Sequence, residues 1–204
     1  MNPPLKLGFL ASGTGSSAQA IVRAIRRREL AAEARLLVSN NRGAAALDFA
    51  RAEGVPSLCI PTQAEPEAAD VRLAEAMAAH RVELIVLSGY LRRLGAQTLA
   101  LYAGRVLNIH PGPLPEFGGH GMYGRRVHEA VLAARSPASA VVIHLVDEEY
   151  DHGPEVARRA VEVRPDDTPE TLEARVRELE PAFFVETLER IARGDLALPR
   201  EAHR

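Results

Sequence analysis

The chain has 204 residues, 47% of them hydrophobic, and a formal net charge of −2 from 25 basic and 27 acidic side chains. This length and apolar content predict one ordinary domain with a sizeable core. The near-neutral charge gives no general field for a nucleic acid or a membrane surface. A single cysteine, Cys59, excludes an internal disulfide and a multi-cysteine metal site. With no signal peptide and no apolar stretch of about 18 residues, we expect a cytoplasmic protein.

The first half of the chain alternates short apolar runs with helical patterns. Strands are predicted at 5–10, 34–38, 56–60, 84–87 and 105–109, and helices at 17–28, 44–53, 67–80 and 94–102. Such alternation is typical of βαβ units around a sheet that is buried on both faces. Residues 1–110 therefore predict the nucleotide-binding half of an α/β fold with a doubly wound, mostly parallel sheet.

The second half has a different pattern. A long loop rich in Pro and Gly occupies 110–123, followed by a helix at 126–134. Strands at 138–146 and 156–163 predict an antiparallel pair. Thr168 is a good N-cap for a last helix that runs towards Arg193, with Pro181 interrupting or kinking it. Residues 194–204 predict a short strand or a frayed tail, and we expect 1–204 to form one domain with 111–204 as its second half.

A glycine-rich loop, Leu10–Ser17, joins the first strand to the first helix. Its glycines allow a close backbone approach, and the helix start offers free N–H groups to a phosphate, here at Gly15, Ser16 and Ser17. A dinucleotide fingerprint would need a third glycine where the chain has Ala18, and an acid after the second strand. The loop therefore favours one phosphate over a dinucleotide. The alternative is a tight turn with a serine cap.

Asn108 and His110 lie at the end of a predicted strand. Because alternate strand residues point to one face, they project together at the edge where open α/β sheets bind ligands. An amide donor beside an imidazole suits acyl transfer. The alternative is a structural histidine. His144 alternates with Val142 and Val146, so it belongs either to the same site or to the core.

The link between the last two predicted strands, Asp147–Pro154, holds four acids: Asp147, Glu148, Glu149 and Asp151. A carboxylate from this loop that reached His110 would orient the imidazole and favour its charged form. The residues alone do not choose among the four acids, and a solvated turn is the alternative. His120 and His128 do not match a metal signature, so we expect no metal.

Nearly the whole chain resembles the folate-dependent formyltransferase family, and within it the members that formylate glycinamide ribonucleotide in purine synthesis. The resemblance is carried by SGTGSS, VLSGYLRRL, VLNIHPGPLPEFGGHGMYGRRVHEAVLAA, HLVDEEYDHGPEVARRAVEV and LEARVRELE. The NIHPxxLP segment and the acidic DEEYDHGP loop are its most specific parts. It implies the α/β fold inferred above, with 111–204 completing the folate and active site.

The resemblance also implies roles for individual residues. Asn108 would contact the formyl oxygen, His110 would act as the acid–base group, and Asp151 would hold His110. The ribonucleotide would be bound by Gly15, Ser16, Ser17 and Glu180. The co-substrate 10-formyltetrahydrofolate would be bound by Leu91, Arg92, Leu94, Asn108, Asp147, Glu148, Glu149, Tyr150 and Asp151. No metal, nucleic acid or membrane is implied, and the protein would be a monomer or homodimer.

Three positions depart from the family pattern. Ser17 stands where an Asn is common, Pro66 where an Arg reaches the folate, and Pro181 where a His follows Glu180. These departures leave Asn108, His110 and Asp151 unchanged. They affect positions that would contact the substrates. Rival functions are formyltetrahydrofolate hydrolase, methionyl-tRNA formyltransferase and a non-catalytic nucleotide- or folate-binding module. The length of the chain favours the ribonucleotide enzyme over the first two.

Overall fold

The structure is a computed structural model that describes residues 3–198. Its elements agree with the predicted ranges to within one or two residues. In chain order they are β1 (Leu5–Leu10), α1 (Ser16–Arg26), β2 (Ala32–Ser39), α2 (Ala45–Ala52), β3 (Ser57–Cys59), α3 (Pro66–Ala79), β4 (Leu84–Leu87), α4 (Ala96–Leu101), β5 (Val106–His110), α5 (Arg125–Ala133), β6 (Ala138–Leu145), β7 (Glu155–Glu162) and α6 (Pro169–Arg193). No helix within 3–198 is long and apolar enough to cross a membrane.

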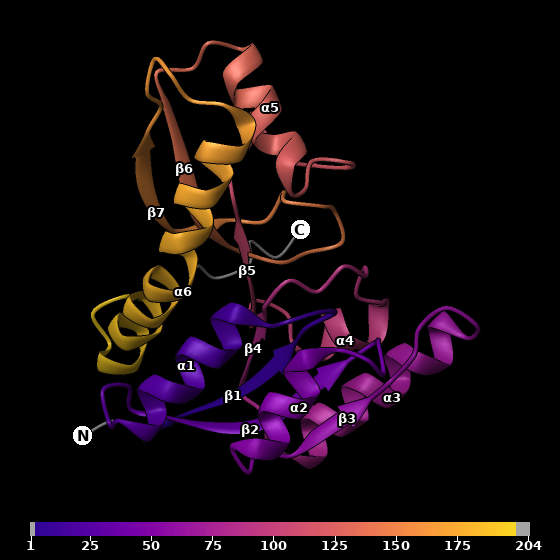
Figure 1. Ribbon diagram of the computed structural model, residues 1–204. Helices are drawn as coiled ribbons and strands as arrows, with labels where there is room; N and C mark the ends of the chain where they lie inside the picture. The colour runs from indigo at the N-terminus through magenta and orange to yellow at the C-terminus, as the bar shows by residue number, and fades with distance from the viewer. Residues whose placement is uncertain (1–2, 199–204) are drawn as a thin grey trace.

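The strands form one seven-stranded sheet in the order β3-β2-β1-β4-β5-β6-β7 (Figure 1). Strands β1 to β5 are parallel, and β6 runs antiparallel to both β5 and β7. The predicted mostly parallel sheet with an antiparallel β6–β7 pair is therefore confirmed. The chain passes from β1 outward to β3 and then returns to β4. The loops after β1 and β4 thus flank the point where the strand order reverses, which is where such sheets bind ligands.

Apolar side chains cover both faces of the sheet. On one face Phe9 of β1 belongs to a cluster with Ile21 of α1 and Phe184 of α6, all fully buried. On the other face Leu36 of β2 belongs to a cluster with Met77 of α3. Since burial of apolar area is the main favourable term in folding, these two layers explain why the strands of the first half are nearly continuous apolar runs.

Helix α6 begins with the predicted cap. The Thr168 hydroxyl accepts from the Thr171 N–H at 3.3 Å, and the Thr171 hydroxyl accepts from the Thr168 N–H at 2.9 Å. Of the two predicted effects of Pro181, the interruption is wrong, because the helix continues through it to Arg193, and the kink stays a prediction. Pro181 removes one backbone donor, but the residues that follow it include Phe183 and Phe184, which are buried in the core and hold the helix in place.

The last residues of the chain are predicted to form a short strand or a frayed tail. Gly194, with φ +83°, ends α6 in the left-handed conformation that favours glycine. Residues 194–198 contain no strand, and the rest of the predicted tail, 199–204, lies outside the described residues.

Candidate active site

The core of the site lies where β5 meets β6. Asn108 of β5 is directly opposite His144 of β6 in the antiparallel register. Side chains opposite each other on antiparallel strands share one face. The Asn108 Nδ2 atom accordingly lies 3.1 Å from His144 Nε2. The other nitrogen of His144, Nδ1, lies 2.8 Å from the Leu145 carbonyl oxygen, which can only accept.

Asp151 joins the two buried histidines. Its Oδ2 lies 3.4 Å from His110 Nδ1, and its Oδ1 lies 3.5 Å from His144 Nε2. The Gly119 N–H donates to Oδ2 at 3.1 Å. Burial alone would raise the pKa of Asp151, but hydrogen bonds from His110, His144 and Gly119 outweigh it and hold the pKa well below its usual range. Asp151 is therefore a partly buried carboxylate, and the structure separates it from the exposed Glu148 and Glu149 of its loop.

The backbone of the acidic loop is shaped to present this carboxylate. Asp151 has φ +54°, a left-handed conformation that few residues other than glycine adopt, although Asp is among those that tolerate it. A Cβ at Gly153 would lie 2.0 Å from the Leu145 carbonyl oxygen. Glycine is thus the residue that lets the chain pass β6 closely enough to bring Asp151 to the two histidines.

Both ring nitrogens of His110 face acceptors. Nε2 donates to the Phe117 carbonyl oxygen at 2.7 Å, and Nδ1 faces the Asp151 carboxylate. An imidazole with an acceptor at each nitrogen is suited to carry two protons. The side chain is only 3% exposed. Its Nε2–H therefore reaches a ligand only after it gives up the Phe117 carbonyl.

The structure assigns His144 to this cluster, which the sequence left open between site and core. Its side chain is 2% exposed, and its Nε2 lies between Asn108 and Asp151. That nitrogen accepts from the Asn108 amide when neutral and donates to Asp151 when protonated. The alternation with Val142 gave the correct face, but the pairing with Asn108 depends on a strand register that the sequence does not display.

The glycine loop has the geometry expected of an anion site. Gly15, with φ +64°, precedes α1, and a Cβ there would lie 3.1 Å from that of Ala46. Ser16 is exposed at the first turn of the helix, where its N–H groups are free of intrahelical partners. Ser17 is buried, at 2% exposure. Of these three residues Ser16 is exposed, whereas Gly15 and Ser17 are both buried.

Glu180 of α6 lies in a half-buried position among other charged groups. Burial raises the pKa of Glu180 to about 7, with Arg177 acting in the opposite direction. The carboxyl therefore changes charge near neutral pH. Among the described residues, no hydrogen bond or ion pair links Glu180 to Asn108, His110, His144 or Asp151.

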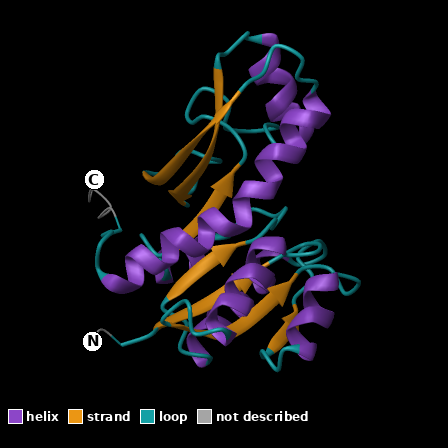
Figure 2. Ribbon diagram, turned by 60° about the vertical axis from the view of Figure 1, so that its left-hand side comes forward, coloured by secondary structure: helices purple, strands orange, loops and turns teal. Residues whose placement is uncertain are grey.

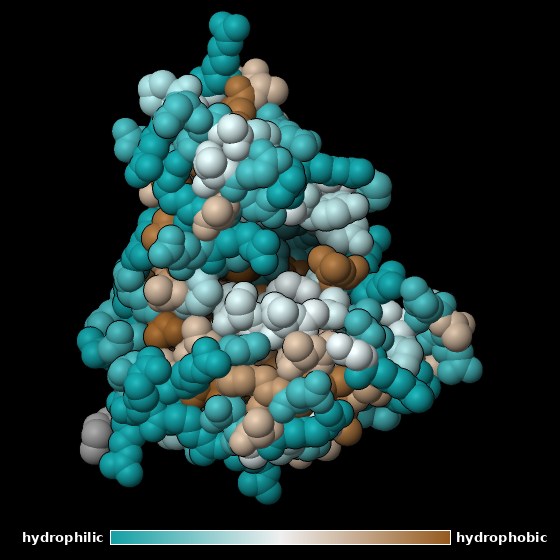
Figure 3. Space-filling view, viewed as in Figure 1, coloured by the Kyte–Doolittle hydropathy of each residue, from teal (hydrophilic) through white to brown (hydrophobic). Residues whose placement is uncertain are grey.

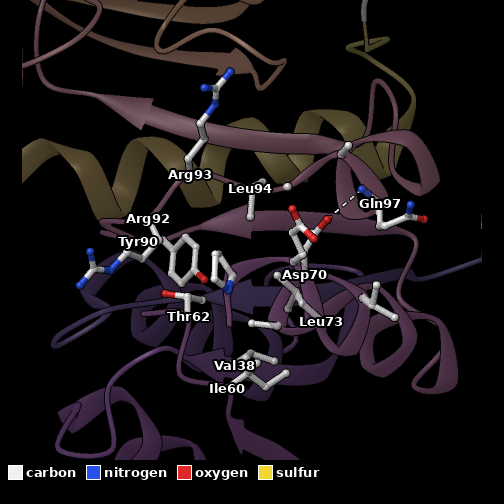
Figure 4. A pocket seen from close by; sticks show the side chains of 16 residues that line it. Val38, Ile60, Thr62, Asp70, Leu73, Tyr90, Arg92, Arg93, Leu94 and Gln97 are labelled. Carbon is white, nitrogen blue, oxygen red and sulfur yellow. Dashed lines mark hydrogen bonds between the residues drawn. The ribbon is translucent and has the colours of Figure 1, made fainter. Parts of the chain in front are cut away.

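The segment after β4 carries the residues expected to bind folate. Leu91 is 72% exposed, Arg92 is exposed, and Leu94 is buried. A cavity of about 680 Å³ opens beside this segment, and Arg92, Leu94, Tyr90 and Asp70 are among its lining residues (Figure 4). Its lining does not include Asn108 or the acidic loop. The structure therefore brings Arg92 and Leu94 together with α3 in a cavity that Asn108 does not line.

The remaining residues of the acidic loop lie on its surface. Asp147 accepts from the Glu149 N–H and from His152 Nδ1, both at 2.9 Å. Glu148, Glu149 and Tyr150 are exposed, and the Glu148 carbonyl accepts from the Arg93 guanidinium. The loop is therefore tied at one end to the segment after β4 and at the other, through Asp151, to the histidines.

The molecular surface is hollowed on one face. Figure 3 shows one face of the molecule hollowed between the part formed by β1–β4 with their helices and the part formed by the elements after β5. His128 of α5 is 1% exposed, and burial lowers its pKa. Within 3–198 no group of three or more His, Cys, Asp or Glu side chains could hold a metal ion.

Comparison with known proteins identifies the class. The formyl transferase family model matches residues 5–188, so the chain belongs to the formyl transferase family. That assignment agrees with the parallel sheet and its antiparallel extension described above.

Named relatives are more specific. The chain is 36% identical over 187 residues to the chloroplastic phosphoribosylglycinamide formyltransferase of Arabidopsis thaliana, covering 90% of this chain and 64% of that protein. It is 35% identical over 188 residues to the phosphoribosylglycinamide formyltransferase of Bacillus subtilis, covering 91% of this chain and 94% of that protein. This chain thus spans less than two thirds of the plant relative.

A solved structure has the same fold. The phosphoribosylglycinamide formyltransferase of Coxiella burnetii superposes with a TM-score of 0.84 at 35% sequence identity, over 94% of this chain and 88% of that one. The two chains therefore share their overall fold.

Proposed function

We propose that this protein transfers the formyl group of 10-formyltetrahydrofolate to the amine of glycinamide ribonucleotide. The observation that carries the proposal is the partly buried Asp151 carboxylate, which lies within 3.5 Å of both His110 and His144 while Asn108 lies 3.1 Å from His144. This places an amide donor, an imidazole and a fixed negative charge at one strand end. Family membership and the names of the relatives support the choice of substrates.

In the proposed reaction the substrate amine attacks the formyl carbon. A C–N bond forms, the carbonyl π electrons move to oxygen, and the tetrahedral intermediate collapses as the bond to the folate nitrogen breaks. Asn108 and protonated His110 stabilise the negative oxygen, an effect worth typically 10²–10³ in rate for one donor. A proton leaves the amine and reaches the departing folate nitrogen through His110 or a water that it orders.

The chain's own geometry suggests how these groups are held. His144 Nδ1 carries a hydrogen towards the Leu145 carbonyl, so its Nε2 is free to accept from one N–H of Asn108. The second N–H of that amide is then available to the formyl oxygen. His110 has to exchange the Phe117 carbonyl for a substrate atom, which requires a small movement of the loop that carries Phe117.

The proposed contacts with the two substrates are those that the family resemblance implies. We propose that Gly15, Ser16 and Ser17 bind the ribonucleotide phosphate and that Glu180 contacts the same substrate. We assign the folate to Leu91, Arg92, Leu94, Asn108 and the loop from Asp147 to Asp151. We also keep as predictions that the protein is cytoplasmic, a monomer or homodimer, needs no metal and binds no nucleic acid.

One assay separates this function from its rivals. The purified protein is incubated with 10-formyltetrahydrofolate, with and without glycinamide ribonucleotide, and tetrahydrofolate release is followed. Release that depends on the ribonucleotide is the expected result. Release without it would indicate a formyltetrahydrofolate hydrolase, and no release in either condition would indicate a non-catalytic binding module.

A further inference from the structure

Ser12, a residue of the glycine loop with no role so far, connects the two halves of the substrate site. Its hydroxyl accepts from the Leu91 N–H at 2.8 Å and donates to Asn40 Oδ1 at 2.6 Å. Its backbone N–H donates to the Gly89 carbonyl at 3.1 Å. One residue therefore joins the loop after β1, the end of β2 and the segment after β4.

A second hydrogen bond joins the same two segments a few residues away. The Ala18 N–H in the first turn of α1 donates to the Ser88 hydroxyl at 3.0 Å, and Ser88 is only 3% exposed. Ser88 to Gly95 form no helix or strand, and two backbone hydrogen bonds fix their first residues: the Ser88 N–H donates to the Leu10 carbonyl at 2.8 Å and the Ser12 N–H donates to the Gly89 carbonyl at 3.1 Å. From Leu91 onward the glycine loop holds the segment through the Ser12 hydroxyl, which accepts from the Leu91 N–H.

We propose that the Ser12 hydroxyl is a positioning group that couples the ribonucleotide subsite to the folate subsite. The inference rests on the proposed function, which assigns the phosphate to Gly15–Ser17 and the folate to Leu91–Leu94. A ligand that orders either segment orders the other through Ser12, so the second ligand loses less conformational entropy on binding. Each ligand then binds more tightly in the presence of the other, by the same factor in both directions.

The proposed coupling depends on the hydroxyl group of Ser12. In Ser12→Ala the Leu91 N–H and the Asn40 side-chain Oδ1 each lose a hydrogen-bond partner. The backbone bond from the Ser12 N–H to the Gly89 carbonyl and the bond from the Ala18 N–H to the Ser88 hydroxyl remain. The fold is therefore kept, and only the link between the two segments is weakened. Ser12→Thr restores a hydroxyl that accepts and donates, so it separates loss of the link from a general effect of substitution.

The test measures binding without turnover. Isothermal titration calorimetry gives the Kd of tetrahydrofolate, which has no formyl group to transfer, with and without saturating glycinamide ribonucleotide. We expect wild type to bind at least about 5-fold more tightly with the ribonucleotide, within the usual range of coupling between sites. The ratio should fall to about 1 in Ser12→Ala and recover in Ser12→Thr.

A matched control is Ser136→Ala, since Ser136 donates its hydroxyl to the Ala138 carbonyl at 2.7 Å in the turn before β6. It should keep the wild-type ratio. A wild-type ratio near 1, or an unchanged ratio in Ser12→Ala, would overturn the coupling while leaving the proposed function intact. If wild type binds neither ligand, the proposed function fails and the coupling fails with it.

Discussion

Asp151 is the residue on which the two buried histidines of the site converge. Its left-handed backbone, with φ +54°, is maintained although most residues avoid this conformation, and such positions often occur at functional sites. The neighbouring acids Glu148 and Glu149 are exposed to solvent. The chemistry of Asp151 therefore comes from its backbone conformation and burial, and not from the acidic character of its loop.

Removing the charge of Asp151 tests its role. Asp151→Asn keeps the shape and one acceptor, but it no longer favours a positive charge on His110. We expect turnover to fall by about 10²–10³, the scale seen when one electrostatic contribution is lost. Steady-state rates of the purified variant measure this. Asp166→Asn, an exposed carboxylate near α6, is the control, and near-normal turnover in Asp151→Asn would exclude the proposed role.

Glu180 predicts a pH dependence of stability. Its pKa of about 7 in the folded state exceeds the value of about 4.3 for an unfolded glutamate. The neutral form is therefore favoured by folding, and the stability linked to this group is present below pH about 4.3 and lost as pH rises through about 7.

Glu180→Gln should remove this dependence. Relative to wild type, its free energy of unfolding should rise by up to about 3 kcal/mol between pH 4 and pH 8. Urea denaturation at both pH values measures the change. Glu178→Gln, on an exposed face of the same helix, should show no such rise, and an equal change in both variants would contradict the assignment to Glu180.

At the scale of elements, the segment from β4 to α4 is held on both sides. Ser12 and Ser88 join it to the glycine loop, and Arg93 joins it to the Glu148 carbonyl of the acidic loop. The rings of His120 and Tyr150 add an edge contact between the acidic loop and the loop after β5. Irregular segments rather than strands thus form the walls of the site, and strands fix only its floor.

The Arg93 contact predicts a selective effect on one substrate. Arg93→Ala should loosen the acidic loop on the side assigned to folate, because the Glu148 carbonyl loses its charged donor. We expect KM for 10-formyltetrahydrofolate to rise several-fold, consistent with losing one hydrogen bond to a charged group, with little change in KM for the ribonucleotide. Steady-state kinetics with each substrate varied measure both values.

The control for this variant is Arg51→Ala, an exposed arginine paired with Asp48 on α2, away from the site. It should leave both KM values unchanged. Equal increases in both KM values for Arg93→Ala would argue against a folate-side role and for a general loosening of the site.

At the scale of the whole molecule, two elements join the halves of the chain. Strand β5 pairs with β4 on one side and β6 on the other. Helix α6 packs against α1 of the first half and α5 of the second, and Figure 2 shows it running along the length of the molecule. The sheet and the long helix therefore make each half part of the packing surface of the other.

This architecture predicts cooperative unfolding. Because neither half can bury its apolar surface without α6 and β5, we expect one thermal transition, coincident by far-ultraviolet circular dichroism and intrinsic tyrosine fluorescence. Phe184 is fully buried in α6, so Phe184→Ala should lower the free energy of unfolding by about 3–5 kcal/mol. The midpoint temperature should fall without a split of the transition. Two separate transitions would show that the halves are independent units.

The sequence by itself determined the elements and the strand-end position of the site. Periodicity and caps are local properties, so β1, α6 and the alternation of Asn108 with His110 could be predicted from neighbouring residues. The continuity of α6 through Pro181 could not, because it depends on the burial of Phe184 against distant strands. Likewise the choice of Asp151 over its neighbours rested on resemblance until its burial was known.

What only the tertiary structure decided are the contacts between distant segments. The pairing of Asn108 with His144 follows from the antiparallel register of β5 and β6, and the links made by Ser12 and Arg93 follow from the sheet order. Register and strand order are set by packing over the whole sheet, where many weak contacts add together. Local patterns in the sequence therefore specify which residues face the site, and the assembled sheet specifies which of them meet.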